Sequence, residues 1–259
     1  MRWGLSISLS GELADPKVVA GVAVLAEEAG WDGVFVWDHL WNRTLAPFAD
    51  PFVTLAAIAL ATDRVRIGTL VTALSRRRPQ LVAQSTTSLD RVSDGRMVLG
   101  LGLGVDSHGE YSAFDEPAAD DRARAKALDS GIDVLKQMLA GEPVARADGR
   151  ITTVASVQQP RVPIWIAGTA KYTAGPRRVH RHGVEGLALV GASTWSPDNV
   201  TTALQGGGLS AGEIDLALVG GAHPDSHALA EVGATWCIPE ILPDATASDA
   251  KAHASTSPR

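Results

Sequence analysis

The sequence predicts an α/β protein that folds as a single TIM-type (β/α)8 barrel with parallel strands. Short apolar segments alternate with amphipathic helical segments along the chain, which is typical of parallel α/β folds. Eight strand candidates occur in 259 residues, close to the roughly 250 residues typical of this barrel. With 45% hydrophobic residues, the chain can bury one sizeable core. We expect a compact barrel with a short C-terminal part.

The first strand and helix are the clearest elements. Apolar residues alternate with small ones from Trp3 to Leu9, which is the period of a half-buried strand. Asp15 and Pro16 suit the N-cap and first position of a helix, and Gly30 ends it. The same reasoning predicts strands at 34–37, 65–71 and 97–101, with helices that begin at Pro51 and Pro79.

The second half of the chain continues the alternation less regularly. A loop at 102–119 precedes a strongly amphipathic helix that Gly141 ends, and residues 141–162 are expected to form a surface excursion. Further strands are expected at 163–168, 186–191, 214–220 and 234–238. The barrel domain is therefore predicted at 1–240, and the polar tail at 241–259 is left to supply the last helix.

Charge and cysteine content limit the kinds of partner and the cellular location that we expect. Lys and Arg total 23 against 29 Asp and Glu, a net charge of -6, so we expect no nucleic acid as partner. A single cysteine, Cys237, allows no internal disulfide and favours a cytoplasmic location. The first residues do not resemble a signal peptide, and no run of about 18 apolar residues suggests a membrane span. We expect a small-molecule substrate and leave a homodimer open.

Functional groups of a barrel lie on the loops after the C-terminal ends of its strands. Asp38 and His39 directly follow the second strand, and we weigh them as catalytic residues against a capping Asp and a surface His. Three arginines, Arg76 to Arg78, follow the third strand. We interpret them as a solvated basic turn rather than as a phosphate clamp.

Two small-residue segments are candidates for binding a ligand. The glycines from Gly100 to Gly104 permit close approach to the backbone. They do not form a dinucleotide fingerprint, because Val105 and a polar loop follow where a helix must begin. The loop of Ala167, Gly168 and Thr169 offers backbone N–H groups and a hydroxyl to a phosphate.

The histidine pairs do not favour a metal. His180 and His182 fall in a predicted helix, where residues two apart point in different directions. His223 and His227 are four residues apart, but no further ligand accompanies them. We expect no metal, and a metal-dependent barrel hydrolase remains only as an alternative.

Several segments together resemble the luciferase-like monooxygenase family, whose members use FMN or the deazaflavin coenzyme F420. They are AEEAGWDGVFVWDHL, the stretch from DPFVTLAAIALATDRVRIGTL to RMVLGLGLG, EYSAFDEP, GIDVLKQMLAGEPV and PRVPIWIAG. The resemblance covers roughly residues 1 to 190, with GATWCIPE similar to the family's last strand. It implies a barrel with a flavin or deazaflavin ring at its mouth, acting by hydride transfer or oxygen activation.

The resemblance assigns roles to residues after the second and third strands. Asp38 and His39 match the Asp-His pair of the deazaflavin dehydrogenases, in which the His lies beside the reactive ring carbon. His39 is then expected to move the proton that accompanies hydride transfer, and Asp38 to favour the protonated imidazole if it contacts the ring. Thr69, Leu70 and Val71 match a segment that often holds a non-proline cis peptide, so a cis bond is expected between Leu70 and Val71.

The remaining cofactor contacts are expected after the fourth and fifth strands. The matching positions for the ribityl phosphate and its surroundings are Leu103, Gly104, His108, Ala167, Gly168 and Thr169. His108 also competes with His39 for the proton. The sugar-phosphate dehydrogenases of the family carry a catalytic Glu where this chain has Val105, followed by Asp106. This departure argues against a closely similar substrate or mechanism. A non-catalytic flavin-binding protein remains an alternative to an enzyme, because the family includes such members and the polar tail is poor in apolar residues.

The phosphate assignment predicts the effect of Thr169→Val. Loss of one hydrogen bond to a charged group costs about 1.5 to 3 kcal/mol, so cofactor affinity measured by fluorescence titration should fall by the corresponding factor. Unchanged affinity would place the phosphate elsewhere.

Overall fold

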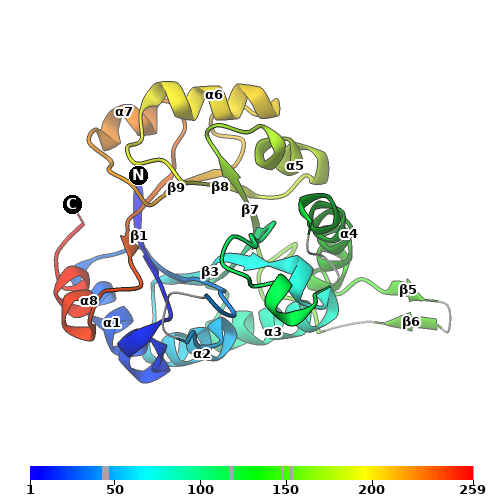
Figure 1. The fold of residues 1–259 in the computed structure, drawn as a ribbon, viewed down its shortest axis with the longest axis horizontal. Helices are drawn as coiled ribbons and strands as arrows, with labels where there is room; N and C mark the ends of the chain where they lie inside the picture. The colour runs from blue at the N-terminus through cyan, green and yellow to red at the C-terminus, as the bar shows by residue number, and fades with distance from the viewer. Residues whose placement is uncertain (43–46, 117–119, 147–148, 152–153, 259) are drawn as a thin grey trace.

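The computed structural model describes residues 1–42, 47–116, 120–146, 149–151 and 154–258. Parallel strands form its centre and helices surround them, as Figure 1 shows. Strand β10 pairs with β1, with Arg2 opposite Trp236, and this pairing closes an eight-stranded barrel. The predicted fold class is confirmed. The barrel strands are β1 (Arg2–Ile7), β2 (Gly33–Val36), β3 (Arg66–Ala73), β4 (Met97–Gly102), β7 (Ile164–Thr169), β8 (Gly186–Val190), β9 (Asp215–Val219) and β10 (Trp236–Ile238).

The helices of the outer wall begin at capped positions. Asp15 and Asp50 accept hydrogen bonds from the first turns of α1 and α2, where proline occupies the first position, as predicted. The helices are α1 (Pro16–Ala29), α2 (Pro51–Ala61), α3 (Pro79–Val92), α4 (Asp121–Leu139), α5 (Ala174–His182), α6 (Pro197–Gly207), α7 (Ser226–Glu231) and α8 (Ala247–Ala254). Short 3₁₀ segments are η1 (Gly11–Ala14), η2 (Leu74–Arg76) and η3 (Ser112–Phe114).

The polar tail does supply a helix, α8, which packs beside α1 (Figure 1). The indole Nε1 of Trp31, just after α1, donates to the carbonyl oxygen of Ala254 at 3.0 Å. Before α8, the short strand β11 (Glu240–Ile241) pairs with β1, with Ser6 opposite Glu240. The tail therefore completes the wall next to the first strand.

An aromatic layer fills the middle of the barrel. Phe35, Trp165 and Trp236 are fully buried, and each pair of their rings has centroids 5.7 Å apart. Gly186 makes room for this layer, because a Cβ there would lie 2.2 Å from the Trp165 ring. Since strand side chains alternate between faces, residues two or four positions beyond these rings also face the interior, nearer the C-terminal end.

The excursion expected at 141–162 contains a hairpin, β5 (Val144–Arg146) with β6 (Gly149–Ile151), which stands out from the barrel in Figure 1. The chain that follows the hairpin is held by Asp90 in α3, whose carboxylate accepts from the backbone N–H of Val157 at 2.7 Å. No helix in the described residues is long and apolar enough to cross a membrane. Cys237 is buried, as expected, and burial raises the pKa of its thiol to about 11.

Candidate active site

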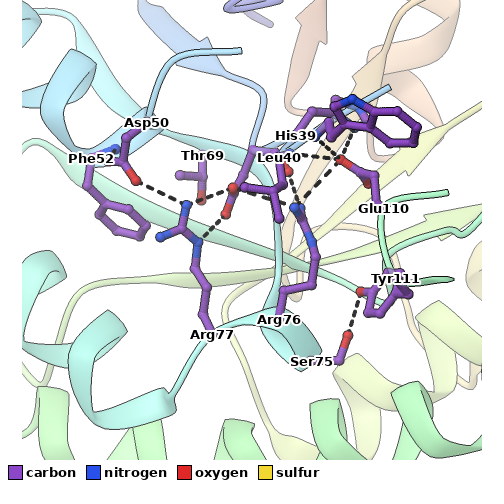
Figure 2. A network of polar contacts seen from close by, with 12 residues as sticks. His39, Leu40, Asp50, Phe52, Thr69, Ser75, Arg76, Arg77, Glu110 and Tyr111 are labelled. Atoms are coloured by element: carbon purple, nitrogen blue, oxygen red, sulfur yellow. Dashed lines mark hydrogen bonds and ion pairs between the residues drawn. The ribbon is translucent and has the colours of Figure 1, made fainter. Parts of the chain in front are cut away.

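Three loops meet at the C-terminal end of the barrel because β2, β3 and β4 are neighbours in the sheet. His39 follows β2, Arg76 ends η2 after β3, and Glu110 lies in the loop after β4. Figure 2 shows these side chains converging, with polar contacts between the loops. The geometry therefore joins groups that are far apart in the sequence at the end where barrel enzymes do their chemistry.

Glu110 is the acceptor at the centre of this network. Its Oε1 lies 3.0 Å from Nδ1 of His39, accepts from the N–H of Leu40 at 2.8 Å, and lies 3.6 Å from Nη1 of Arg76. Only 3% of the Glu110 side chain is exposed. Burial by itself would raise the pKa of Glu110, but the hydrogen bond from His39 and the charge of Arg76 hold it below the ordinary value. Glu110 is therefore ionised at neutral pH.

The charge of Glu110 determines which nitrogen of His39 carries a hydrogen. An ionised carboxylate only accepts, so the Nδ1 of His39 donates to it and the other nitrogen, Nε2, is the basic one in the neutral imidazole. No hydrogen bond to Nε2 is present among the described residues. The His39 side chain is 30% exposed, and the rings of Trp37 and Phe48 flank it at 5.7 and 5.2 Å. His39 can thus exchange a proton with a bound molecule.

Asp38 makes a different contact from the one that we considered. Both of its carboxylate oxygens accept from Arg77, at 2.7 Å from Nε and 2.8 Å from Nη2, and only 1% of the side chain is exposed. The carboxylate next to the His39 ring is that of Glu110. Asp38 consequently anchors the end of β2 to the loop after β3.

The arginines after β3 correct our interpretation of a solvated turn. Arg76 has a 6% exposed side chain and donates to the carbonyl oxygen of Asp38, while Arg77 bridges Asp38 and Asp50. Burial alone would lower the pKa of Arg77, but these two carboxylates raise it. Only Arg78 is exposed. Local sequence could not distinguish buried from solvated arginines, because the anions that pair with them come from other loops.

The end of β3 has the predicted backbone. The peptide bond between Leu70 and Val71 is cis, which confirms that expectation. Thr69 is fully buried, and its hydroxyl donates to the carbonyl oxygen of Gly100 at 2.9 Å. Val71 is partly exposed. Of these three, Val71 therefore presents the most accessible side chain.

The loop after β4 turns at Gly104, whose φ of +76° favours glycine. A Cβ at Gly104 would lie 2.1 Å from the Tyr111 hydroxyl. That hydroxyl lies 2.6 Å from the Ser75 hydroxyl, which ties this loop to η2. Leu103 is partly exposed and His108 is exposed. These positions border the same end of the barrel as His39.

The C-terminal end of β7 lies farther around the barrel. Ala167, Gly168 and Thr169, which we expected to form a loop, are instead the last three residues of this strand and are partly exposed. The Thr169 hydroxyl accepts from the N–H of Tyr172 at 3.3 Å. This contact leaves the hydroxyl hydrogen of Thr169 available to an acceptor. Small residues and apolar side chains line this end and suit a planar ring. A Cβ at Gly102, for example, would lie 2.5 Å from a methyl group of Val71. The residues present thus fit a flavin or deazaflavin with its phosphate at Thr169.

The histidine pairs have separate partners. His223 Nε2 lies 3.1 Å from the carbonyl oxygen of Leu218, and His227 lies beside Glu231. His182 is buried against Asp133 at 2.9 Å, whereas His180 is exposed. Within the described ranges, no group of three or more His, Cys, Asp or Glu side chains could hold a metal ion.

Sequence reasoning missed the role of Glu110 and the pairing of Arg76 and Arg77 with carboxylates. Glu110 opens the segment EYSAFDEP that carries part of the family resemblance, so the signal was present without a role attached to it. Val105, where related sugar-phosphate dehydrogenases carry Glu, is 52% exposed. The carboxylate beside His39 comes five positions later in this chain.

Comparison with known proteins shows which family the chain resembles. The model of the luciferase-like monooxygenase family matches residues 4–199. An F420-dependent glucose-6-phosphate dehydrogenase of Microbacterium testaceum is 30% identical, over 91% of this chain and 68% of its own length. That of Beutenbergia cavernae is 35% identical over 64% of this chain, which spans about half (51%) of the relative.

Solved structures support the fold. A monooxygenase from Streptomyces bottropensis superimposes with a TM-score of 0.69 at 19% identity, covering 98% of both chains. The coenzyme F420 dependent tetrahydromethanopterin reductase from Methanopyrus kandleri gives 0.67 at 19% identity, over 85% of this chain and 65% of the other. Identities this low establish a shared barrel and nothing about substrate.

The network predicts how Glu110→Gln affects stability. Loss of the charge leaves Arg76 less well paired, so the free energy of unfolding should fall by about 1 to 3 kcal/mol. Because the folded pKa of Glu110 is lowered, its stabilisation is present above the unfolded value of about 4.3 and is lost as pH falls through the folded value. Urea denaturation at pH 7 and at successively lower pH measures this difference.

Glu28→Gln is the matched control, because Glu28 is exposed on α1 and should change stability little at either pH. A loss for Glu110→Gln that stays the same at all pH values would mean that the charge of this carboxylate is not its cause.

Proposed function

Because the chain belongs to the luciferase-like monooxygenase family, we propose that it is a flavin- or deazaflavin-dependent oxidoreductase acting on a small organic substrate. The cofactor is coenzyme F420 or FMN. The observation that carries the proposal is the partly exposed His39, whose Nδ1 is held by the buried Glu110 at the C-terminal end of the barrel. A hydrogen-bonded imidazole at this position is what a proton transfer coupled to redox chemistry requires.

The cofactor site in this proposal spans the ends of three strands. Leu70, Val71 and the Thr69 backbone form one wall for the ring. The phosphate and its linker lie along Leu103, Gly104 and the end of β7 at Ala167, Gly168 and Thr169, with His108 at the edge. Backbone N–H groups and the Thr169 hydroxyl are donors suited to a phosphate.

The chemistry supplied by a bound flavin or deazaflavin is exchange of a hydride with substrate carbon, or activation of oxygen by reduced FMN. In the hydride case, His39 Nε2 takes the proton of a substrate hydroxyl in the oxidative direction and returns it in the reductive direction. Glu110 orients the ring and stabilises the imidazolium that forms. Asp38 and Arg77 act as positioning residues, because they hold the end of β2 from which His39 projects.

The names of the relatives favour coenzyme F420 over FMN. The curated relatives include F420-dependent glucose-6-phosphate dehydrogenases, whereas FMN is named in solved structures of 16% identity, among them a riboflavin lyase and a Baeyer-Villiger monooxygenase. Glucose 6-phosphate itself is not carried over, because Val105 stands where such enzymes carry Glu. A cytoplasmic location remains the expectation from the single cysteine.

A cofactor titration tests the function. The purified protein, titrated separately with FMN and coenzyme F420, should bind at least one of them with a change in the visible absorption or fluorescence of the ring. If neither binds at concentrations that saturate related enzymes, the proposed function is wrong.

His39→Ala tests the proton transfer. General acid-base catalysis contributes about 100- to 10,000-fold, so turnover should fall within that range while cofactor affinity changes little. Stopped-flow measurement of ring reduction reports the step directly. His180→Ala, a change at an exposed position on α5, is the control and should retain full turnover. If His39→Ala turns over at the wild-type rate, the proton moves through another group.

A further inference from the structure

Glu240 brings a second carboxyl group to the mouth of the barrel. Two observations indicate that the Glu240 side chain faces the barrel interior. Trp236 and Ile238 belong to the interior aromatic cluster, and alternation along the strand then places Glu240 on the same side. Its register partner on β1 is Ser6. The next pair along the strands, Ile7 and Ile241, packs outward against the helices, so Ser6 and Glu240 face the interior.

The carboxyl group of Glu240 lies against backbone rather than against a charged partner. A Cβ at Gly220, which follows β9, would lie 2.1 Å from its Oε2. The hydroxyl of Ser6 is already held by Trp37, whose Nε1 donates to it at 2.9 Å. Among the described residues no hydrogen bond or ion pair of Glu240 is found, although the side chain is only partly exposed. Burial raises the pKa of Glu240, which favours its neutral form.

The position of Glu240 in the barrel separates it from the proposed phosphate site. In the strand order β7-β4-β3-β2-β1-β11, the segment with Thr169 lies across the barrel, whereas β2, which leads into His39, is adjacent to β1. Glu240 is therefore on the His39 side of the mouth. This is where a substrate must lie if the cofactor phosphate is at Thr169.

Among the described residues, the basic groups near this side are already paired. The inward positions toward the C-terminal ends of the barrel strands include Ser6, Leu70, Val71, Ala167, Val190 and Val219, none of them basic. Arg76 and Arg77 are engaged by Glu110, Asp38 and Asp50. A phosphate group beside Glu240 would lose its hydration without gaining a cation from the described residues, which is unfavourable.

We propose that the carboxyl group of Glu240 contacts the substrate directly and makes the site select uncharged alcohols or carbonyl compounds over phosphate esters. A carboxyl group accepts a hydrogen bond from a hydroxyl, and its neutral form, which burial favours, also donates one to a carbonyl oxygen. This inference rests on the proposed function and adds a substrate class to it.

The first experiment places a cation at this position and uses inorganic phosphate as the probe. In the cofactor-loaded protein, where the cofactor fills its own phosphate site, ³¹P line broadening reports binding of added phosphate. The wild type should bind phosphate weakly or not at all, and Glu240→Lys should bind it about tenfold more tightly. Glu231→Lys, which adds the same charge at an exposed position on α7, should behave as the wild type.

Two results of this experiment overturn the inference. One is phosphate binding by the wild type as tight as that of Glu240→Lys. The other is a folded Glu240→Lys variant, shown by its circular dichroism, that gains no phosphate binding, because the side chain then does not face the ligand.

The second experiment needs only the near-isosteric Glu240→Gln and remains decisive if the lysine variant does not fold. An ordinary glutamate loses the infrared carbonyl stretch of its protonated acid as pH rises through its pKa of about 4.3. In the infrared difference between wild type and Glu240→Gln, this stretch should persist to higher pH, because burial raises the pKa of Glu240. The groups that face Glu240 from β1 and from the end of β9 are Ser6 and Gly220, and neither titrates. Loss of the band at the pH of an ordinary glutamate overturns the inference.

Cofactor binding by the wild type and by Glu240→Gln is measured first. If neither protein binds FMN or coenzyme F420, the proposed function fails. If both bind the cofactor but the phosphate or infrared result is contrary, the function stands and only the substrate class assigned through Glu240 is wrong.

Discussion

The site depends on one buried carboxylate oxygen, Oε1 of Glu110. It accepts from the His39 ring and the Leu40 backbone after β2, and it faces the Arg76 guanidinium after β3. This oxygen joins three loops, and the same contacts keep the Glu110 carboxylate ionised. Removing any of these partners would leave a charge buried without compensation, so the orientation of His39 and the packing of the loops are a single property.

The barrel makes this convergence possible. Parallel strands end at the same rim, and the aromatic layer of Phe35, Trp165 and Trp236 fills the interior below it. Above that layer most of the inward positions on the described strands are small or aliphatic, and several are partly exposed. The polar groups at the rim are therefore presented to a ligand from a rigid base, with the interior closed beneath them.

Charge is distributed unevenly around the rim. On the β2 to β4 side, Arg76 and Arg77 are matched by Asp38, Asp50 and Glu110, which forms a nearly neutral network. Next to β1, Glu240 has no cation beside it among the described residues, and burial favours its neutral form. The proposed preference for an uncharged substrate next to His39 rests on this difference.

The sequence by itself determined the order and type of the elements, because capping residues such as Asp15 and Asp50 and the strand alternation from Trp3 are local signals. It also indicated His39 and the cis bond after Leu70, through their places in a family pattern. Only the tertiary structure decided the partners: Glu110 rather than Asp38 beside His39, carboxylates rather than solvent around Arg76 and Arg77, and an inward-facing Glu240. Burial and pairing depend on which distant loops meet when the sheet closes, and no local pattern encodes that meeting.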